Sequence, residues 1–166
     1  GSCGSRVLEH AAVYQASSVA YRDMDASALG FPKGVTPLLD QPATLALPCP
    51  IPGVPTATLS TGANVVSGAA YDAIEAEMVD METWALVRAA QTFEVPLIAL
   101  RGVSDGRTEL KGLEDWTSTL HHVDENLAEA WDRLITVLEA GGLAALDHAA
   151  PGRLDPAHLP APEPTA

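Results

Sequence analysis

The sequence has few basic residues and no long apolar run, and each shortage excludes a class of protein. Lysine and arginine number 9 against 22 aspartates and glutamates, which gives a formal net charge of −13. A protein of that charge repels phosphate backbones and anionic membrane surfaces, so neither nucleic acid nor a membrane is expected as a partner. No apolar stretch approaches the roughly 20 residues that span a bilayer. The N-terminus also lacks the basic-then-apolar order of a signal peptide.

Cysteine is scarce, and its two positions, Cys3 and Cys49, lie in unrelated contexts. No CxxC pair and no Cys/His spacing indicates a zinc site or a disulfide framework. His121 and His122 are neighbours on an expected helix, where adjacent side chains do not share a face, so a joint metal site is disfavoured. We therefore expect a cytoplasmic protein with two passive thiols, without a metal and without a cofactor.

The chain is long enough for one domain with a sizeable core. It has 166 residues, of which 47% are hydrophobic, a globular composition. The tail, residues 149–166, is rich in proline and alanine and has no periodicity, so we expect it to be disordered. The predicted domain is residues 1–148.

Periodicity predicts alternating strands and helices. Strands are expected over 12–21, over 56–66 running into a glycine turn, and over 79–81, whereas the proline-rich segment 30–55 should be irregular. Ser67 is a plausible cap for a short helix. We expect a helix over 83–93, a strand covered on both faces over 95–103, and a long helix ended by Gly141-Gly142. The apolar face of that last helix is predicted to contain Leu120, Val123, Leu127, Trp131, Leu134 and Leu138. This order indicates a layered α/β fold.

Asp105 follows the most buried predicted strand. In α/β sheets ligands collect outside the carboxyl ends of strands, and partial burial would raise the pKa of this carboxyl group, as a general acid requires. The alternative is that Asp105 caps the turn at Gly106, a role that aspartate often has. On position alone, the turn role is the better interpretation of Asp105, and the role as an acid stays open.

Asp80 and Glu82 are two apart on a short extended segment, so their side chains should face one way and those of Val79 and Met81 the other. Carboxylates that point into a cleft can accept hydrogen bonds from sugar hydroxyls. The alternative is that one of them caps the helix that follows. Taken alone, capping is the better interpretation.

Four segments taken together resemble the superfamily of nucleoside phosphorylases and 5′-methylthioadenosine/S-adenosylhomocysteine nucleosidases. "VDMETWALVRAAQTFEVPLIALRGVSDG" (residues 79–106) resembles the segment in which a D/E-M-E triplet opens a helix and an apolar strand ends in R-x-[IV]-S-D. "GSCGS" resembles its small-residue loop G-[ST]-[AC]-G-G. "AYRDMDASALGF" is similar to Y-x-D-x-D-x-T-A-x-G-[YF], and "LSTGANVVSG" to S-T/S-G-D-x-[FL]-[IV].

The resemblance implies a three-layer α/β/α fold around a twisted mixed sheet, a homodimer, and cleavage of the N-glycosidic bond of a purine nucleoside. Asp105 would then protonate the purine at N7, and Glu82 would bind the ribose hydroxyls. Ser104 and Arg101 would support Asp105 from its own strand.

The resemblance also implies the lining of the pocket. Met81 would pack on the sugar, and Val65 and Val66 would line the base pocket, where Val66 also offers backbone hydrogen bonds. Ser2 and Gly4 would border the ribose and the attacking water or phosphate.

Several positions depart from the family pattern. Ala63 stands where the family has aspartate, Val65 where an aromatic residue often follows, and Ser5 where the second glycine of the loop is expected. Base recognition should therefore differ from that of methylthioadenosine enzymes. Thr83 and Trp84 stand where small residues are common, which is expected to reshape the 5′ side of the pocket.

The first strands of the family domain, and the glutamate that activates water in the nucleosidases, have no counterpart in this sequence. Three functions are therefore carried forward. The leading one is a purine nucleosidase that uses water, acting on a simple or 5′-substituted nucleoside such as methylthioadenosine or S-adenosylhomocysteine. The others are a phosphate-dependent phosphorylase and a non-catalytic remnant that binds nucleosides or oligomerises.

Overall fold

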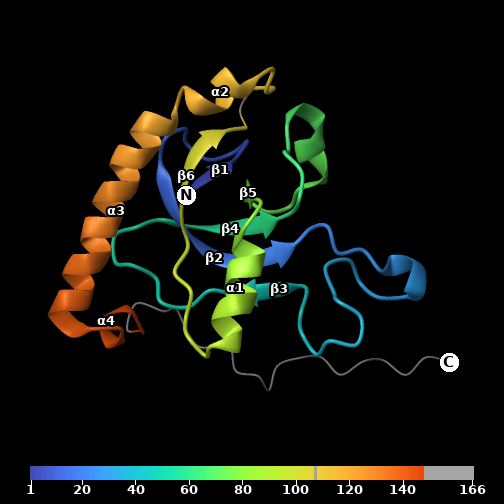
Figure 1. Ribbon diagram of the computed structural model, residues 1–166, viewed down its shortest axis with the longest axis horizontal. Coiled ribbons are helices and arrows are strands. Elements are labelled where there is room, and N and C mark those ends of the chain that lie inside the picture. The colour runs from blue at the N-terminus through green and yellow to red at the C-terminus, as the bar shows by residue number, and fades with distance from the viewer. Residues whose placement is uncertain (107, 148–166) are drawn as a thin grey trace.

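The computed structural model describes residues 1–106 and 108–147. Six strands form a mixed sheet in the order β3-β2-β4-β5-β1-β6 (Figure 1). The strands are β1 (Ser2–Gly4), β2 (Val13–Tyr21), β3 (Thr44–Ala46), β4 (Thr56–Thr61), β5 (Met78–Asp80) and β6 (Leu100–Asp105). The helices are α1 (Thr83–Thr92), α2 (Leu113–Thr117), α3 (Leu120–Gly141) and α4 (Ala144–Asp147), with 3-10 helices η1 (Ser27–Leu29) and η2 (Gly68–Ala73).

The long strand β2 bends the sheet back on itself. Its later residues pair with β3 in antiparallel and with β4 in parallel orientation, whereas residues 13–15 pair with residues 100–102 of β6 in antiparallel orientation. Because one strand contacts both β4 and β6, the sheet curls around the short central strands β5 and β1. This curl brings the ends of β4, β5, β1 and β6 close together.

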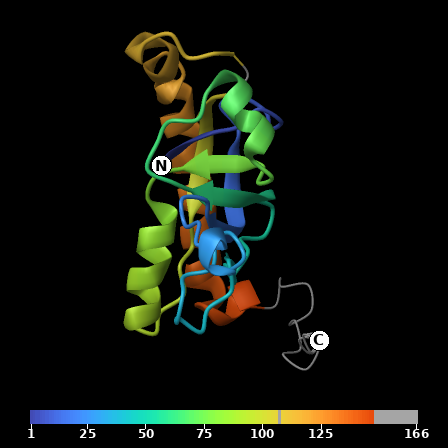
Figure 2. The same ribbon diagram turned by 90° about the vertical axis from the view of Figure 1, so that its right-hand side faces the viewer.

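Helices cover the sheet from two sides, which confirms the predicted three-layer α/β fold. Trp84 and Val87 of α1 pack with Leu59, Met78 and Val103 of the sheet in the main core. A second cluster joins α3 to β6 and to the loop before β4, and contains Cys49, Ile51, Leu134 and Leu146. Figure 1 shows α3 running along one side of the strands, and Figure 2 shows α1 standing out from one face of the sheet.

The expected strand over 95–103 begins later than predicted, at Leu100. Val95 is 54% exposed, and its amide donates to the carbonyl of Ala90 at 3.1 Å, which extends the end of α1 instead of starting a strand. Pro96 has no amide hydrogen to donate to a neighbouring strand. The apolar run therefore divides into an extended connection and a shorter buried strand.

The long helix α3 is confirmed, including its end at Gly141 with Gly142 as the C-cap residue, but its predicted apolar face is wrong at one position. Trp131 is 56% exposed, and Ala130 is buried in its place beside Val123 and Leu134. A seven-residue step almost completes two turns at 3.6 residues per turn, so Ala130 lies on the face of Val123 and Trp131 is rotated away from it.

Two further expectations concerned the C-terminal tail and membrane-spanning helices. The expected disordered tail, residues 149–166, lies outside the described residues. Over 1–106 and 108–147, no helix combines the length and the apolar character needed to cross a membrane.

Candidate active site

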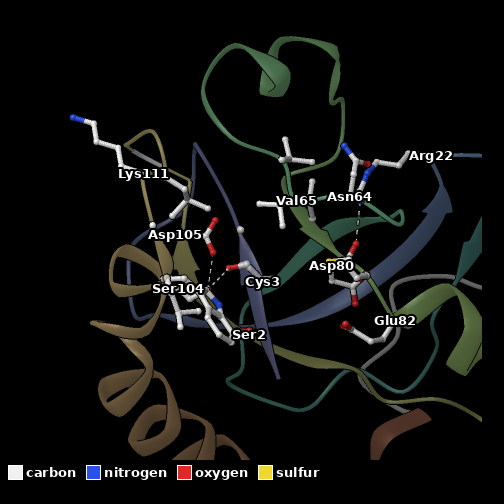
Figure 3. Close-up of a pocket in the computed structure, with 18 residues that line it drawn as sticks. Ser2, Cys3, Arg22, Asn64, Val65, Asp80, Glu82, Ser104, Asp105 and Lys111 are labelled. Atoms are coloured by element: carbon white, nitrogen blue, oxygen red, sulfur yellow. Dashed lines mark hydrogen bonds between the residues drawn. The ribbon is translucent and has the colours of Figure 1, made fainter.

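A cavity of about 680 Å³ opens where β1 lies between β5 and β6. β1 and β6 are parallel, with Gly4 opposite Asp105, so their carboxyl ends meet. β5 is antiparallel to β1, so its carboxyl end leaves near the start of β1. As Figure 3 shows, Asp105 and Glu82 consequently approach the cavity from opposite sides of β1. The structure thus brings the two predicted catalytic carboxylates to one cavity.

Asp105 is half-buried at the end of β6. Burial raises the pKa of its carboxyl group above the ordinary value, and the Ser104 hydrogen bond and the nearby charge of His10 oppose part of that rise. Ser104 Oγ lies 2.8 Å from Asp105 Oδ2, as the resemblance implied. Gly106 then turns the chain at φ 113°, where a Cβ would lie 2.5 Å from the carbonyl oxygen of Ser5, so only glycine fits there.

Helix capping and a place at the cavity were the two alternatives for Asp80 and Glu82, and the structure gives capping to Asp80 and the exposed position at the cavity to Glu82. Asp80 is buried, and its Oδ2 accepts hydrogen bonds from the amide of Thr83 at 3.0 Å and from Thr83 Oγ1, so it caps α1. Thr61 Oγ1 donates to its other oxygen. The Glu82 side chain is 61% exposed and lines the cavity. Because Asp80 meets the needs of the helix end, the Glu82 carboxylate remains available to a ligand.

The structure contradicts the expectation that Arg101 supports Asp105. Arg101 is buried; its Nη2 lies 2.6 Å from Asp80 Oδ2, 2.7 Å from Thr83 Oγ1 and 3.7 Å from Glu82 Oε2. Arg101 and Asp105 are four residues apart on β6, which separates their backbones by about 13 Å. Arg101 therefore holds the Asp80 side of the site, behind the cavity wall.

Apolar side chains form the part of the wall that resemblance assigned to the base and the sugar. Val66 is buried, whereas Val65 is 65% and Met81 47% exposed, and all three line the cavity. Leu113 and Trp116 of α2 line it as well, and sequence reasoning missed both. Their signal was weak, since α2 has five residues and no periodicity.

Thr83 and Trp84 do not reshape the pocket as expected. Thr83 is fully buried and hydrogen-bonds to Asp80, and Trp84 stacks on Tyr21 at 5.5 Å between ring centroids. Both side chains point into the protein because the first turn of α1 faces the sheet. Neither lies among the cavity-lining residues.

Strand β1 forms the floor of the site through Ser2, Cys3 and Gly4. Burial raises the pKa of the Cys3 thiol to about 12. A thiol that stays protonated at neutral pH is a poor nucleophile, which agrees with the predicted passive role. Ser5, which replaces the family's second glycine, is fully buried, and its hydroxyl donates to the carbonyl of Glu77 at 2.6 Å.

Arg22 is a third residue that sequence reasoning missed, although it lies inside the segment "AYRDMDASALGF". Its Nη1 donates to the carbonyls of Ser60 at 2.6 Å and Asp80 at 3.0 Å, and its Nη2 to the carbonyl of Asn64 at 2.7 Å. One guanidinium therefore joins the ends of β4 and β5 to the loop that leads to Val65. Arg22 is the residue that holds this wall of the cavity in place.

The cavity at the carboxyl ends of the strands is where small ligands bind in many α/β proteins. The chain belongs to the phosphorylase superfamily, whose sequence model matches residues 53–136, slightly more than half of the 166 residues. This match confirms the resemblance found in the sequence. No curated protein sequence matches the chain at a significant level.

Several solved structures are similar to this one. A futalosine hydrolase of Helicobacter pylori strain 26695 has a TM-score of 0.70 at 19% identity, covering 82% of this chain and 65% of that one. An MTA/SAH nucleosidase has a TM-score of 0.68 at 25% identity, with coverages of 88% and 63%. The nucleosidase of Colwellia psychrerythraea 34H, in complex with adenine, has a TM-score of 0.68 at 19% identity, with coverages of 88% and 65%. The chain spans less than two thirds of the length of these proteins.

Proposed function

We propose that the protein cleaves the N-glycosidic bond of a purine nucleoside, with water as the nucleophile. The observation that carries this proposal is the placement of two unlike carboxylates on one cavity. Asp105 is half-buried and has a raised pKa, whereas Glu82 is exposed. Carboxyl groups whose environments differ in this way suit an acid and an anion in the same reaction.

Asp105 acts as the general acid in this proposal. Cleavage leaves the bonding electrons on the purine, so a proton given to N7 stabilises the leaving base as the bond breaks. A raised pKa keeps a larger fraction of Asp105 protonated near neutral pH. Ser104 then stabilises the carboxylate left after proton transfer, since its hydroxyl lies within hydrogen-bond distance of Oδ2.

Glu82 acts on the sugar. The ribose gains positive charge as the glycosidic bond breaks, and a carboxylate bonded to its hydroxyls interacts more strongly with that cationic ring than with the substrate. Met81 packs on the sugar, while Ser2 and Gly4 border the ribose and the water. Val65 and Val66 contact the base, for which a mostly apolar wall is suitable.

The names of the similar structures support a nucleoside substrate. They include MTA/SAH nucleosidases, one of them bound to adenine, and a futalosine hydrolase. We extend the proposal to a 5′-substituted nucleoside such as methylthioadenosine or S-adenosylhomocysteine. Two buried cysteines that carry thiols instead of a disulfide accord with a cytoplasmic enzyme. We also propose that the protein is a homodimer, as the resemblance implies, which analytical ultracentrifugation would test.

Base release from a panel of nucleosides tests the proposed function. The full-length protein is incubated with methylthioadenosine, S-adenosylhomocysteine, adenosine, inosine and AMP, with and without phosphate, and free base is measured by chromatography. We expect free base to be released in the absence of phosphate. Strict dependence on phosphate would identify a phosphorylase, and no base from any substrate would identify a non-catalytic protein.

Replacing Glu82 with glutamine is expected to lower kcat/KM by at least about tenfold, because glutamine can still accept a hydrogen bond but lacks the negative charge that stabilises the cationic sugar. Steady-state base release measures the effect. Glu114→Gln is the matched control, since Glu114 is exposed on α2 and does not line the cavity. Equal loss in both variants would remove Glu82 from the mechanism.

A further inference from the structure

The Tyr71 hydroxyl is buried without a hydrogen-bond partner among the described residues. Tyr71 lies in η2 and is 4% exposed, and its ring packs against Val66 and Val79. A buried hydroxyl that makes no hydrogen bond loses its interactions with water and gains nothing in exchange. Such a group requires an explanation in a folded protein.

The position of this hydroxyl is defined by Gly4. A Cβ built on Gly4 would come closer than 3.0 Å to both Tyr71 Oη and Asp105 Oδ1. The two oxygens are therefore less than twice that distance apart, and the space between them exists because residue 4 has no side chain. Because Gly4 has no side chain, no side-chain atom of residue 4 separates Tyr71 Oη from the Asp105 carboxyl group.

We propose that Tyr71 is a positioning residue for Asp105, whose hydroxyl donates a hydrogen bond to Asp105 Oδ1 across Gly4 once the carboxyl group is ionised. The inference rests on the proposed function in assigning that ionised state to the moment after Asp105 has given its proton to the base. A small rotation of the carboxylate, or one bridging water, closes the remaining gap. Tyr71 keeps its own proton throughout: it contributes only a hydrogen bond, and none of its covalent bonds forms or breaks.

The charges around Tyr71 keep it in the donor form. Burial, Asp105 and Cys3 raise the pKa of the phenol, and the guanidinium groups of Arg22 and Arg6 oppose part of that rise. The Arg6 guanidinium also lies 5.9 Å from the centre of the Tyr71 ring. The phenol therefore remains protonated over the pH range in which a carboxyl group titrates, and it can donate to the carboxylate throughout.

Asp105 has a second carboxylate oxygen, Oδ1, that can accept from another donor, because Ser104 lies next to Oδ2. Ser104 Oγ lies 2.8 Å from Oδ2, and among the described residues the titratable groups whose charges interact with Asp105 include His10, Cys3 and Tyr71. A donor to Oδ1 stabilises the ionised form more than the neutral one, because a hydrogen bond to a carboxylate is stronger than one to a neutral acid. Tyr71 and Ser104 together would hold both oxygens of Asp105 and fix its orientation toward the base.

The pKa of Asp105 itself tests the inference. It is measured in the full chain, without substrate, from the ¹³C shift of the carboxyl carbon as a function of pH. Tyr71→Phe is expected to raise this pKa by about one unit, because the donor to the carboxylate is lost. Ser104→Ala calibrates the loss of a known neighbour, and Tyr14→Phe is the matched control, a half-buried tyrosine on β2 that does not line the cavity.

Phenylalanine keeps the ring that packs against Val66 and Val79, and a thermal unfolding curve checks that Tyr71→Phe is folded. An unchanged or lowered Asp105 pKa in that folded variant overturns the inference. A raised Asp105 pKa supports the inference. In an active protein, the pH at which kcat/KM falls should then shift to a higher value by the same number of pH units. If the wild-type protein releases no base but the pKa still rises, the proposed function fails and the hydrogen bond stands.

Discussion

Replacing Asp105 with asparagine is expected to lower kcat/KM by at least about 10²-fold, the lower end of what a general acid contributes. Asparagine preserves the size of the side chain and can accept from Ser104 Oγ, but it has no acidic proton for the base. Steady-state base release on the best substrate of the panel measures the loss. Asp72→Asn is the control, because Asp72 is an exposed carboxylate paired with Arg6, away from the cavity.

The stability of the Asp105→Asn variant separates lost catalysis from lost folding. The folded-state pKa of Asp105 is raised above its ordinary value, so its stabilising contribution is present below the unfolded-state pKa and is lost as pH rises through the folded-state pKa. At neutral pH the ionised group therefore opposes folding. Asparagine removes that charge, so we expect an unchanged or higher Tm together with the loss of activity. Near-normal activity would exclude Asp105 as the acid.

The same raised pKa sets the pH dependence of the wild-type enzyme. Asp105 must be protonated to act, so kcat/KM should fall as pH rises through its pKa, with a midpoint above that of an ordinary aspartate. Asp105→Asn should lose this limb of the profile. A profile that is flat through the acidic and neutral range would contradict the role.

The fold was predictable where one short pattern determined the structure. Helix α3 followed from its apolar periodicity, and its end at Gly141 followed from the glycine pair, whereas helix α1 lies close to the range expected for it. The start of β6 was not predictable. The apolar run begins at Val95, but the amide of Val95 donates to the carbonyl of Ala90 at the end of α1, so the strand begins only later in the run. Ser67 shows the same difficulty: its hydroxyl accepts from the amide of Leu110 at 2.9 Å instead of capping η2.

The candidate site was predictable only where family motifs carried it. Glu82 and Asp105 came from motif resemblance, and the structure adds that both face one cavity. Arg22 and Tyr71 were not predictable, since their surroundings come from segments far apart in the sequence. Gly4, for example, lies next to Tyr71 only because β1 pairs with β5, the strand that follows η2 in the sequence. Side-chain packing of that kind leaves no local pattern.

Replacing Asp80 with alanine is expected to lower the free energy of unfolding by about 3–5 kcal/mol, the usual cost of leaving one member of a buried ion pair alone. The Asp80 side chain is 1% exposed and that of Arg101 10%, with Asp80 Oδ2 2.6 Å from Arg101 Nη2. The variant also removes the acceptor that caps α1 at Thr83. Urea unfolding of the full chain, followed by circular dichroism, measures the change.

The cause of this loss is separable with two further variants. Glu82→Ala removes an exposed carboxylate 3.7 Å from the same guanidinium and should cost no more than about 1 kcal/mol. Asp80→Ala/Arg101→Met removes the uncompensated charge as well, so it should be more stable than Asp80→Ala alone. If the double variant is the less stable of the two, the Arg101 guanidinium stabilises the fold through packing and through Thr83 more than its unpaired charge destabilises it. The buried pair would then be a consequence of how α1 begins instead of its cause.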